Sequence, residues 1–198
     1  VDTGIDYTHN DFINSGGSST NAAQGGQIDV ADGFNYVNNT ANAQDDHGHG
    51  THVAGIAAAS ANNGASYNVN GVNMGMAGLG YNAQIIPFKV LDSTGNGTYS
   101  AIANGIIRAA DRGALIINLS LGGPAYAQTL QSAVTYAWNK GSIVIAAAGN
   151  AGNNSALYPA ANNYALGVAS TDVNDARSFF SSYGKWVGVA APGSSIFS

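Results

Sequence analysis

Short apolar runs alternate with stretches of helical periodicity through the second half of the chain. Three runs rich in β-forming residues predict buried strands: residues 83–91, 114–121 and 142–148. The two stretches between them carry apolar side chains at helical spacing: residues 98–112 and 127–140. Two further strands are expected at residues 165–169 and 186–190. Apolar strands separated by helices favour an α/β fold, in which a mostly parallel sheet has helices on both faces.

Both predicted helices have signals at their ends. Thr98 stands where the first helix needs an N-cap, and Gly113 follows its last turn. Gly141 closes the second helix. Residues 14–27 and 62–82 are rich in Asn and Gly and lack periodicity, so we expect two surface loops there. No internal repeat or linker divides the 198 residues, which are enough for one domain with a sizeable core.

The composition argues against several classes of partner. The formal net charge is −5, and the six Lys and Arg are scattered along the sequence, which disfavours nucleic acid. No segment reaches the ~18 apolar residues that a membrane span requires, so no membrane partner is expected. The chain has no cysteine and therefore no disulfide, which is compatible with either redox compartment.

Polar side chains stand at the ends of the predicted strands. Asp2 is expected at the end of a strand and before a glycine turn, Ser120 lies near the end of the run 114–121, and Asn150 follows the run 142–148. Ligands of open parallel sheets gather beyond the carboxyl ends of the strands. We therefore expect these three side chains on one rim of the fold.

A histidine-rich motif precedes a third helical stretch. Residues 47–57 have the sequence His-Gly-His-Gly-Thr-His-Val-Ala-Gly-Ile-Ala, which places an imidazole at the start of a buried helix. His49 is a candidate general base, because imidazole titrates near neutrality. Asp2 is a candidate orienting group, and the amide of Asn150 is a candidate donor to a developing oxyanion. Together these groups indicate peptide hydrolysis, which also needs a nucleophile.

Each of these signals has a simpler interpretation when taken alone. An Asp before Thr-Gly or an Asn after Gly is commonly a turn residue, and a lone His on an alanine-rich helix is commonly a core group. Four His lie within the first 52 residues, but no H-E-x-x-H or Cys/His framework for zinc is present. The single Asp-Thr-Gly at residues 2–4 is similar to that of aspartic proteases, which need two such carboxylates and an all-β fold. The near match to G-x-G-x-x-G at residues 95–100 has Ser as its last residue, which disfavours a nucleotide site.

Nearly end to end, the chain resembles subtilisin-like serine proteases, and among them the thermitase-like group. Six stretches carry this resemblance: residues 1–6, 49–57, 89–92, 118–123, 136–150 and 190–193. The resemblance implies a three-layer subtilisin-like fold and a serine endopeptidase activity. It also implies Asp2 as the triad acid, His49 as the base, Asn150 as the oxyanion side chain and His52 as a structural histidine.

The same resemblance implies that a substrate binds as an extended strand between two chain segments. The first wall is residues 95–97 and the second is residues 120–122. The side chain before the scissile bond is expected between the second wall and residues 147–149. By the same resemblance, Leu157 forms the floor of this pocket. None of the pocket residues is charged, which favours an apolar substrate side chain smaller than the largest aromatics. The substrate-binding residues are thus Gly95, Asn96, Gly97, Ser120, Leu121, Gly122, Ala147, Gly149 and Leu157.

The nucleophile of this family stands in a Gly-Thr-Ser-Met-Ala stretch, and no such stretch occurs in residues 1–198. Ser120 would reproduce the family's order of acid, base and nucleophile, but no helix start follows it to expose and activate its hydroxyl. We therefore expect a partial catalytic domain, incomplete at both ends and inactive alone, with the serine beyond Ser198. The alternative is a non-catalytic homologue that only binds peptides.

Structural calcium is a further implication of the resemblance. Family members commonly hold a calcium ion with an Asp nine residues past the triad acid, which is Asp11 here. Asn63, in the Asn-rich loop 62–76, is a second candidate ligand, since Ca²⁺ prefers oxygen donors. An Asp11 that only caps a turn is the alternative. The resemblance also implies an extracellular location, a removable pro-segment and protein or peptide substrates, and we expect a monomer.

Overall fold

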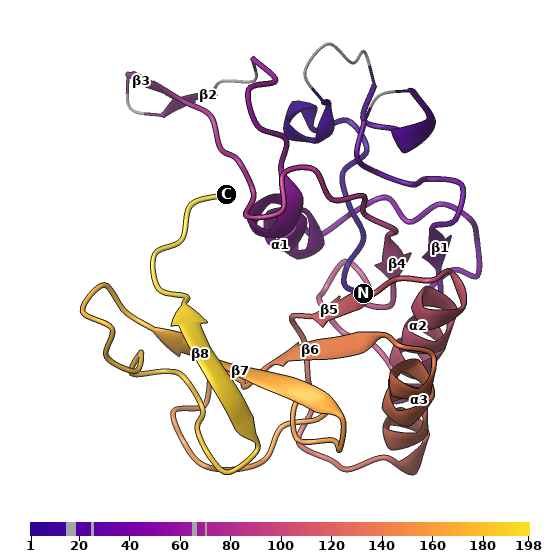
Figure 1. Ribbon diagram of the computed structural model, residues 1–198, viewed down its shortest axis with the longest axis vertical. Coiled ribbons are helices and arrows are strands. Elements are labelled where there is room, and N and C mark those ends of the chain that lie inside the picture. The colour runs from indigo at the N-terminus through magenta and orange to yellow at the C-terminus, as the bar shows by residue number, and fades with distance from the viewer. Residues whose placement is uncertain (15–18, 25, 65–66, 70) are drawn as a thin grey trace. The chain divides into compact units, whose positions relative to one another are not determined.

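The computed structural model describes residues 1–14, 19–24, 26–64, 67–69 and 71–198, and it divides into two compact units (Figure 1). The N-terminal unit is Asp2–Gly97 together with Ser198. The C-terminal unit is Thr98–Phe197 together with Val1. Every helix among the described residues is too short or too polar to cross a membrane.

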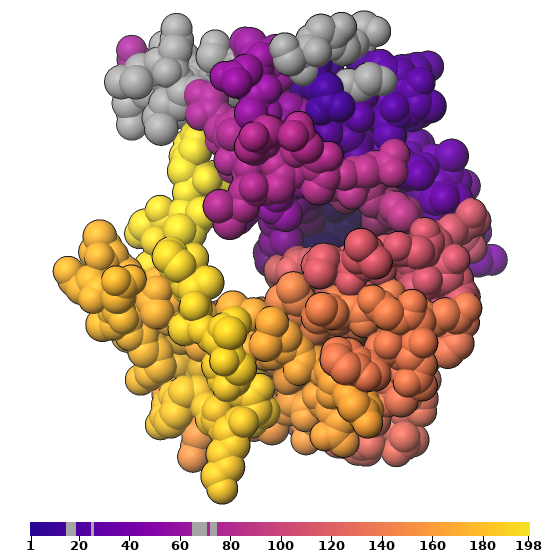
Figure 2. Space-filling model, viewed as in Figure 1, coloured from indigo at the N-terminus to yellow at the C-terminus, as the bar shows by residue number. Residues whose placement is uncertain are grey.

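The C-terminal unit is built on a parallel sheet of four strands in the order β5-β6-β7-β8. The strands are β5 (Ile116–Leu119), β6 (Ile143–Ala147), β7 (Ala165–Thr171) and β8 (Val187–Pro192). β8 lies at one edge of the sheet, and Figure 2 shows it in yellow on the surface. All four strands form where apolar runs predicted them, and the α/β class is confirmed.

Two helices of this unit, α2 (Tyr99–Asp111) and α3 (Gln128–Asn139), pack against each other and against the sheet (Figure 1). Thr98 caps α2 as predicted, because its hydroxyl accepts a hydrogen bond from the Ala101 amide at 3.1 Å. The helix side chains buried most completely include Ile106, Leu130 and Val134.

The strands of the sheet alternate between buried and exposed residues. Ile117 of β5 and Val144 of β6 are buried on the face that α2 and α3 cover. Their neighbours Ile116 and Ile143 are 56% and 41% exposed. This alternation follows the two-residue period of a strand, so each strand contributes every second side chain to the core of this unit.

The N-terminal unit contains α1 and several short elements. They are η1 (Asn10–Phe12), η2 (Ala22–Gln24), β1 (Phe34–Asn35), α1 (His49–Ala58), β2 (Tyr67–Val69), β3 (Val72–Met74) and β4 (Phe88–Lys89). Its apolar core contains Ile5, Phe12, Ile28 and Ala54. The buried helix expected in the histidine-rich motif is α1. It is only partly buried, because residues such as His52 are exposed.

The strand predicted over residues 83–91 is shorter than expected. Only β4 is a strand, and it pairs in parallel with β1, while Ile85 makes an isolated bridge to Ile28. Pro87 lies between these two contacts and has no amide hydrogen to donate to a neighbouring strand. The apolar run therefore breaks into two short pairings.

The loop predicted over residues 62–82 contains a hairpin. β2 and β3 pair in an antiparallel ladder, with Gly71 at a φ of 85° between them. The Asn-Gly at residues 70–71 is a hairpin signal that could have predicted this turn. Residues 65–66 and 70 of this segment lie outside the described residues, as do residues 15–18 and 25 of the loop predicted at 14–27.

Candidate active site

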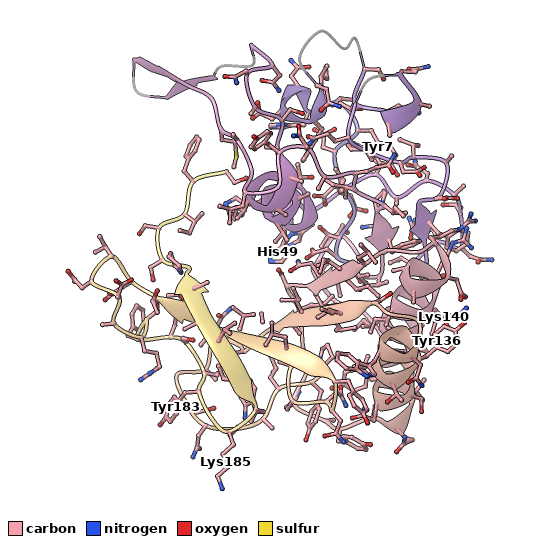
Figure 3. All side chains as sticks on the ribbon, viewed as in Figure 1. Tyr7, His49, Tyr136, Lys140, Tyr183 and Lys185 are labelled. Atoms are coloured by element: carbon pink, nitrogen blue, oxygen red, sulfur yellow. The ribbon has the colours of Figure 1, made fainter. Side chains whose placement is uncertain are left out.

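Asp2 and His49 are in direct contact within the N-terminal unit. Nδ1 of the imidazole lies 2.7 Å from Oδ1 of the carboxylate, a distance typical of a charge-assisted hydrogen bond. Asp2 is 7% exposed, whereas the His49 side chain is 41% exposed. Figure 3 shows His49 at the start of α1. The pair therefore combines a buried acid with an accessible imidazole.

This contact sets the tautomer and the basicity of the imidazole. An ionised carboxylate only accepts hydrogen bonds, so Nδ1 of His49 carries the proton and Nε2 is left as the basic nitrogen. The hydrogen bond from His49 to Asp2 raises the pKa of the imidazole, partial burial opposes the rise, and the charges of Asp2 and Asp45 add to it. The net result is a His49 pKa above its ordinary value.

Backbone pairing holds Asp2 beside β4. The Asp2 amide donates to the Phe88 carbonyl at 3.0 Å, and the Asp2 carbonyl accepts from the Val90 amide at 2.8 Å. The Thr3 amide donates to Asp2 Oδ1 at 2.7 Å, so this oxygen receives a second donor besides the imidazole. The other oxygen, Oδ2, is buried and has no hydrogen-bond partner among the described residues. The carboxylate is therefore oriented by two N–H groups on one oxygen.

A buried lysine stabilises the same segment. Lys89 is 1% exposed, and its Nζ donates to the Thr3 carbonyl at 2.6 Å and the Leu91 carbonyl at 2.8 Å. Its third partner is Oδ1 of Asp46, also at 2.6 Å. An ammonium group has three donors, and these acceptors satisfy all of them. Lys89 thus ties the residue after Asp2 to the chain that precedes His49.

Two glycines allow the helix to approach the turn after Asp2. A Cβ on Gly50 would collide with the carbonyl oxygen of Gly4. Gly4 itself has a φ of 110°, a conformation that side-chain-bearing residues rarely adopt. A larger residue at position 50 would therefore push α1 away from the turn after Asp2.

Asn150 lies in the C-terminal unit, beyond the carboxyl end of β6. Ser120 lies beyond the end of the neighbouring strand β5, so the two residues share one edge of the parallel sheet. Asn150 is exposed, and the Gly149 carbonyl before it accepts a hydrogen bond from the Ser182 amide at 2.9 Å. The structure thus brings Asp2 and His49 together in one unit and holds Asn150 in the other.

Leu157 lies between the two segments from which the substrate pocket is predicted. A Cβ on Gly122 would meet Cδ2 of Leu157 at 2.5 Å, and a Cβ on Gly149 would meet the same atom at 3.0 Å. Two backbone hydrogen bonds of 2.9 Å between Gly123 and Tyr158 hold the chain beside this contact. The remaining predicted residues flank it, with Leu121 buried and Ala147 at the end of β6.

The other predicted wall, residues 95–97, lies in the N-terminal unit. Oδ1 of Asp92 accepts hydrogen bonds from the amides of Thr94 and Asn96 at 2.9 and 3.1 Å, which holds this turn in shape. The His47 imidazole borders Gly95, since a Cβ there would lie 3.4 Å from Nε2 of His47. Glycine is required at residue 97, because a Cβ there would collide with the Val90 carbonyl oxygen.

The family model of the subtilases, peptidase S8, matches residues 1–198. This chain belongs to the subtilase family. It is 48% identical over 198 residues to thermitase of Thermoactinomyces vulgaris, covering all of this chain and 63% of thermitase. The cell wall-associated protease of Bacillus subtilis (strain 168) is 46% identical over 196 residues, which are 99% of this chain and 20% of that protein.

A solved structure, that of a cold adapted subtilisin-like serine proteinase, superposes with a TM-score of 0.79 at 32% identity. The match covers 98% of this chain and 62% of the solved one. The resemblance inferred from the motifs and the subtilisin-like fold are therefore confirmed. This subtilase chain spans less than two thirds of the length of each of these relatives.

Asp11, the predicted calcium ligand of this subtilase, is buried at 4% exposure. Its Oδ1 has no hydrogen-bond partner among the described residues, and burial raises its pKa. The Asn63 side chain hydrogen-bonds to Asp11 and also donates to the Asn10 carbonyl at 3.1 Å. The two predicted ligands are thus neighbours, although no described group of three or more His, Cys, Asp or Glu side chains is arranged around a metal position.

Three residues of this site were missed from the sequence: Thr3, Asp45 and Lys89. Asp45 stands four residues before His49 and just ahead of a helix, a position where Asp commonly satisfies free amides. That signal could have identified it. No local pattern distinguishes Lys89, because an isolated Lys beside an apolar run is usually taken as the solvated end of a strand.

Proposed function

We propose that this subtilase is a serine endopeptidase that hydrolyses peptide bonds in proteins through an Asp-His-Ser triad. The observation that carries the proposal is the 2.7 Å contact between Nδ1 of His49 and Oδ1 of Asp2. It supplies a base together with the group that orients it. Family membership and the serine proteinase among the solved relatives support the same reaction.

In the proposed reaction, Nε2 of His49 takes the proton of the serine hydroxyl while the serine oxygen attacks the scissile carbonyl. The imidazolium that forms is stabilised by the Asp2 carboxylate, which stays ionised. His49 then gives the proton to the leaving amine. A water molecule repeats the sequence on the acyl-enzyme, which releases the acid and restores the serine.

We place the nucleophilic serine in sequence that follows Ser198. Two facts support this placement: residues 1–198 contain no Gly-Thr-Ser-Met-Ala stretch, and they correspond to 63% of thermitase. On this proposal residues 1–198 are a partial catalytic domain that does not turn over substrate by itself. The side-chain amide of Asn150 donates to the oxyanion of the tetrahedral intermediate.

The substrate is proposed to bind as an extended strand between residues 95–97 and residues 120–122. The side chain before the scissile bond enters the pocket whose floor is Leu157. The contacts of Leu157 with Gly122 and Gly149 support an apolar and shallow pocket. Side chains of the size of Leu are therefore preferred over the largest aromatics.

Leu157→Ala is expected to deepen this pocket. The ratio of kcat/KM for peptides with Phe before the scissile bond to that for peptides with Leu should rise about tenfold, because even one methylene group of space in an apolar pocket is worth about 1–3 kcal/mol. The measurement compares matched Leu, Phe and Lys peptides in the complete gene product that contains residues 1–198. Leu79→Ala, at a residue that is 94% exposed, is the control. Fastest cleavage after Lys in the unchanged protein would contradict the proposed pocket.

Calcium is proposed as a structural ion held by Asp11 and Asn63. The buried Oδ1 of Asp11, which has no hydrogen-bond partner among the described residues, suits a hard cation that binds oxygen. Asn63 lies beside it and would supply its side-chain oxygen once its NH2 group gives up the hydrogen bond to Asp11. Asp11 also lines a cavity of about 440 Å³ together with Asp6, Asp45 and other residues of the N-terminal unit, so the surroundings are acidic. Bound calcium would neutralise the buried carboxylate and hold η1 to the loop that carries Asn63.

Removing calcium with a chelator is expected to lower the Tm of the complete gene product. The lost stabilisation is about 2.7 kcal/mol if the ion was present at about 100 times its Kd, because only the folded state holds it. Asp11→Asn should abolish most of this calcium-dependent shift, and Asp29→Asn should preserve it. A Tm that is the same with and without calcium in the unchanged protein would rule the site out.

We propose an extracellular location, a removable pro-segment and a monomeric state. The name of the cell wall-associated relative supports a place outside the cytoplasm. Protein or peptide chains are the proposed partners, and the net charge of −5 supports the view that nucleic acid is not among them.

The activity is tested by treating the complete gene product with a serine-directed peptidyl phosphonate. The proposal expects stoichiometric loss of peptidase activity and a covalent adduct on one serine that lies after residue 198. His49→Ala should prevent both the activity and the labelling. A folded, complete protein that binds peptides but forms no adduct would instead establish the non-catalytic alternative.

A further inference from the structure

The Asp45 carboxylate accepts more hydrogen bonds than a residue that only caps a turn would need. Its Oδ1 accepts from the Thr3 hydroxyl at 2.9 Å and from the amides of His47 and Gly48, both at 3.0 Å. Its Oδ2 accepts from the amide and the hydroxyl of Thr51, at 3.0 and 2.6 Å. One carboxylate thus joins the segment after Asp2, the loop before α1 and the first turn of α1.

The first three amides of α1 have no partners within the helix, and each is satisfied by a side chain. Nδ1 of His47 accepts from the His49 amide at 3.3 Å, the Thr3 hydroxyl accepts from the Gly50 amide at 2.8 Å, and Asp45 accepts from Thr51. Gly48, at the N-cap, has no side chain that could do this. The start of the helix that carries the base is therefore fastened from outside.

Thr3 connects the two halves of the acid–base pair. It follows Asp2 in the chain and is completely buried. Its hydroxyl donates to Asp45 and accepts from Gly50, the residue after His49. A displacement of α1 relative to Asp2 would break both of these hydrogen bonds, so they oppose a change in the separation of Asp2 and His49.

We propose that Asp45 is a positioning residue that holds the His49 imidazole against Asp2 through its hydrogen bonds to Thr3 and Thr51. Its importance for the reaction rests on the proposed protease function. Its effect on the imidazole does not, because it follows from the contacts within the N-terminal unit. Asp45 touches neither substrate nor the reacting atoms and acts only through His49.

The charge of Asp45 persists through the working pH range. Burial opposes ionisation, but the hydrogen bonds from Thr51, Gly48 and His47 together lower the pKa of Asp45 to about 2. Its negative charge in turn raises the pKa of His49, in addition to the larger effect of Asp2. The His47 ring also lies near His49, with 6.3 Å between the two ring centroids.

The decisive variant is Asp45→Asn. Asparagine has one acceptor oxygen where aspartate has two. Its NH2 group would therefore face N–H groups that donate to Asp45, and an NH2 group cannot accept those hydrogen bonds. In the complete gene product, kcat should fall up to about 100-fold with little change in KM, which is the effect of a displacement of about 1 Å in the base. The acid limb of the kcat/KM profile should move to lower pH. Asp29→Asn, with the same charge change in the same unit, should leave kcat and the limb unchanged.

A purely structural role would reduce the amount of folded protein and leave kcat per folded molecule unchanged. The chemical shift of the His49 Cε1 proton, titrated on the same proteins, gives a readout that does not depend on activity. A lower His49 pKa in Asp45→Asn supports the proposal even if the unchanged protein cleaves no peptide. Absence of cleavage would contradict the protease function alone. An unchanged His49 titration and acid limb in folded Asp45→Asn would overturn the proposal.

Thr51 decides the question if Asp45→Asn does not fold. Thr51→Ser keeps the hydroxyl that donates to Asp45 and accepts from the Asp6 amide, whereas Thr51→Val keeps the shape and loses it. The kcat of Thr51→Ser should stay within about twofold of that of the unchanged protein. The kcat of Thr51→Val should fall about tenfold, and the pKa of His49 should be lower in this variant. Equal behaviour of the two variants would overturn the proposal.

Discussion

Replacing Asp2 with asparagine is expected to lower kcat of the complete gene product about 10⁴-fold, with little change in KM. The size is that known from other serine proteases that lose the triad acid, subtilisin included. Oδ1 of Asp2 accepts the Nδ1 proton of His49 at 2.7 Å, and an asparagine can present its NH2 group there instead, which selects the wrong tautomer. Steady-state kinetics on a peptide substrate measure the effect, and Asp29→Asn is the charge-matched control. A loss below tenfold would contradict the assigned role of Asp2.

The pH profile gives this experiment a second readout. Because the hydrogen bond to Asp2 raises the His49 pKa, the imidazole loses its proton at a higher pH than an ordinary histidine does. The acid limb of kcat/KM in the unchanged protein should therefore lie above the ordinary histidine pKa, and activity should fall as the pH drops through the raised pKa. Whatever activity remains in Asp2→Asn should show the limb at lower pH, since the negative charge is gone.

Asn150→Ala is expected to lower kcat about 10²–10³-fold, again with KM nearly unchanged. The size is that known for the oxyanion asparagine of a subtilisin, where the side chain donates only after charge develops on the carbonyl oxygen. The selective effect on kcat is the informative part, because a residue that merely bound substrate would raise KM. Asn139→Ala, at the exposed end of α3, is the control. An Asn150→Ala protein with raised KM and unchanged kcat would remove Asn150 from the proposed oxyanion site.

Local signals predicted the C-terminal unit well. Thr98, the apolar periodicity after it and the glycine at 113 are sufficient for α2, since a cap, a periodic face and a stop all lie within one segment. The strands β5 and β6 were predicted from continuous runs of β-forming residues, which also lie within single segments. The strand around β4 was overestimated because Pro87 removes a donor, and the hairpin of β2 and β3 was missed although Asn-Gly at 70–71 indicates such a turn.

In the candidate site, too, some residues could be predicted from local motifs and others could not. Asp2, His49 and Asn150 were predicted as site residues because each belongs to a motif of consecutive residues. The groups that hold Asp2 and His49 in place belong to no motif. Lys89 bonds to the carbonyl of Thr3, which is 86 positions away in the sequence, and Thr3 bonds to Asp45 across 42 positions.

The sequence by itself determined the family and the α/β class and predicted which residues carry the chemistry, because these depend on residue types at short spacing. Only the tertiary structure decided that the carboxylate and the imidazole meet at 2.7 Å and that Asp45 bonds to the first turn of the helix that carries His49. The physical reason is that a hydrogen bond needs its atoms within about 3 Å, and for residues this far apart in the chain only folding sets that distance.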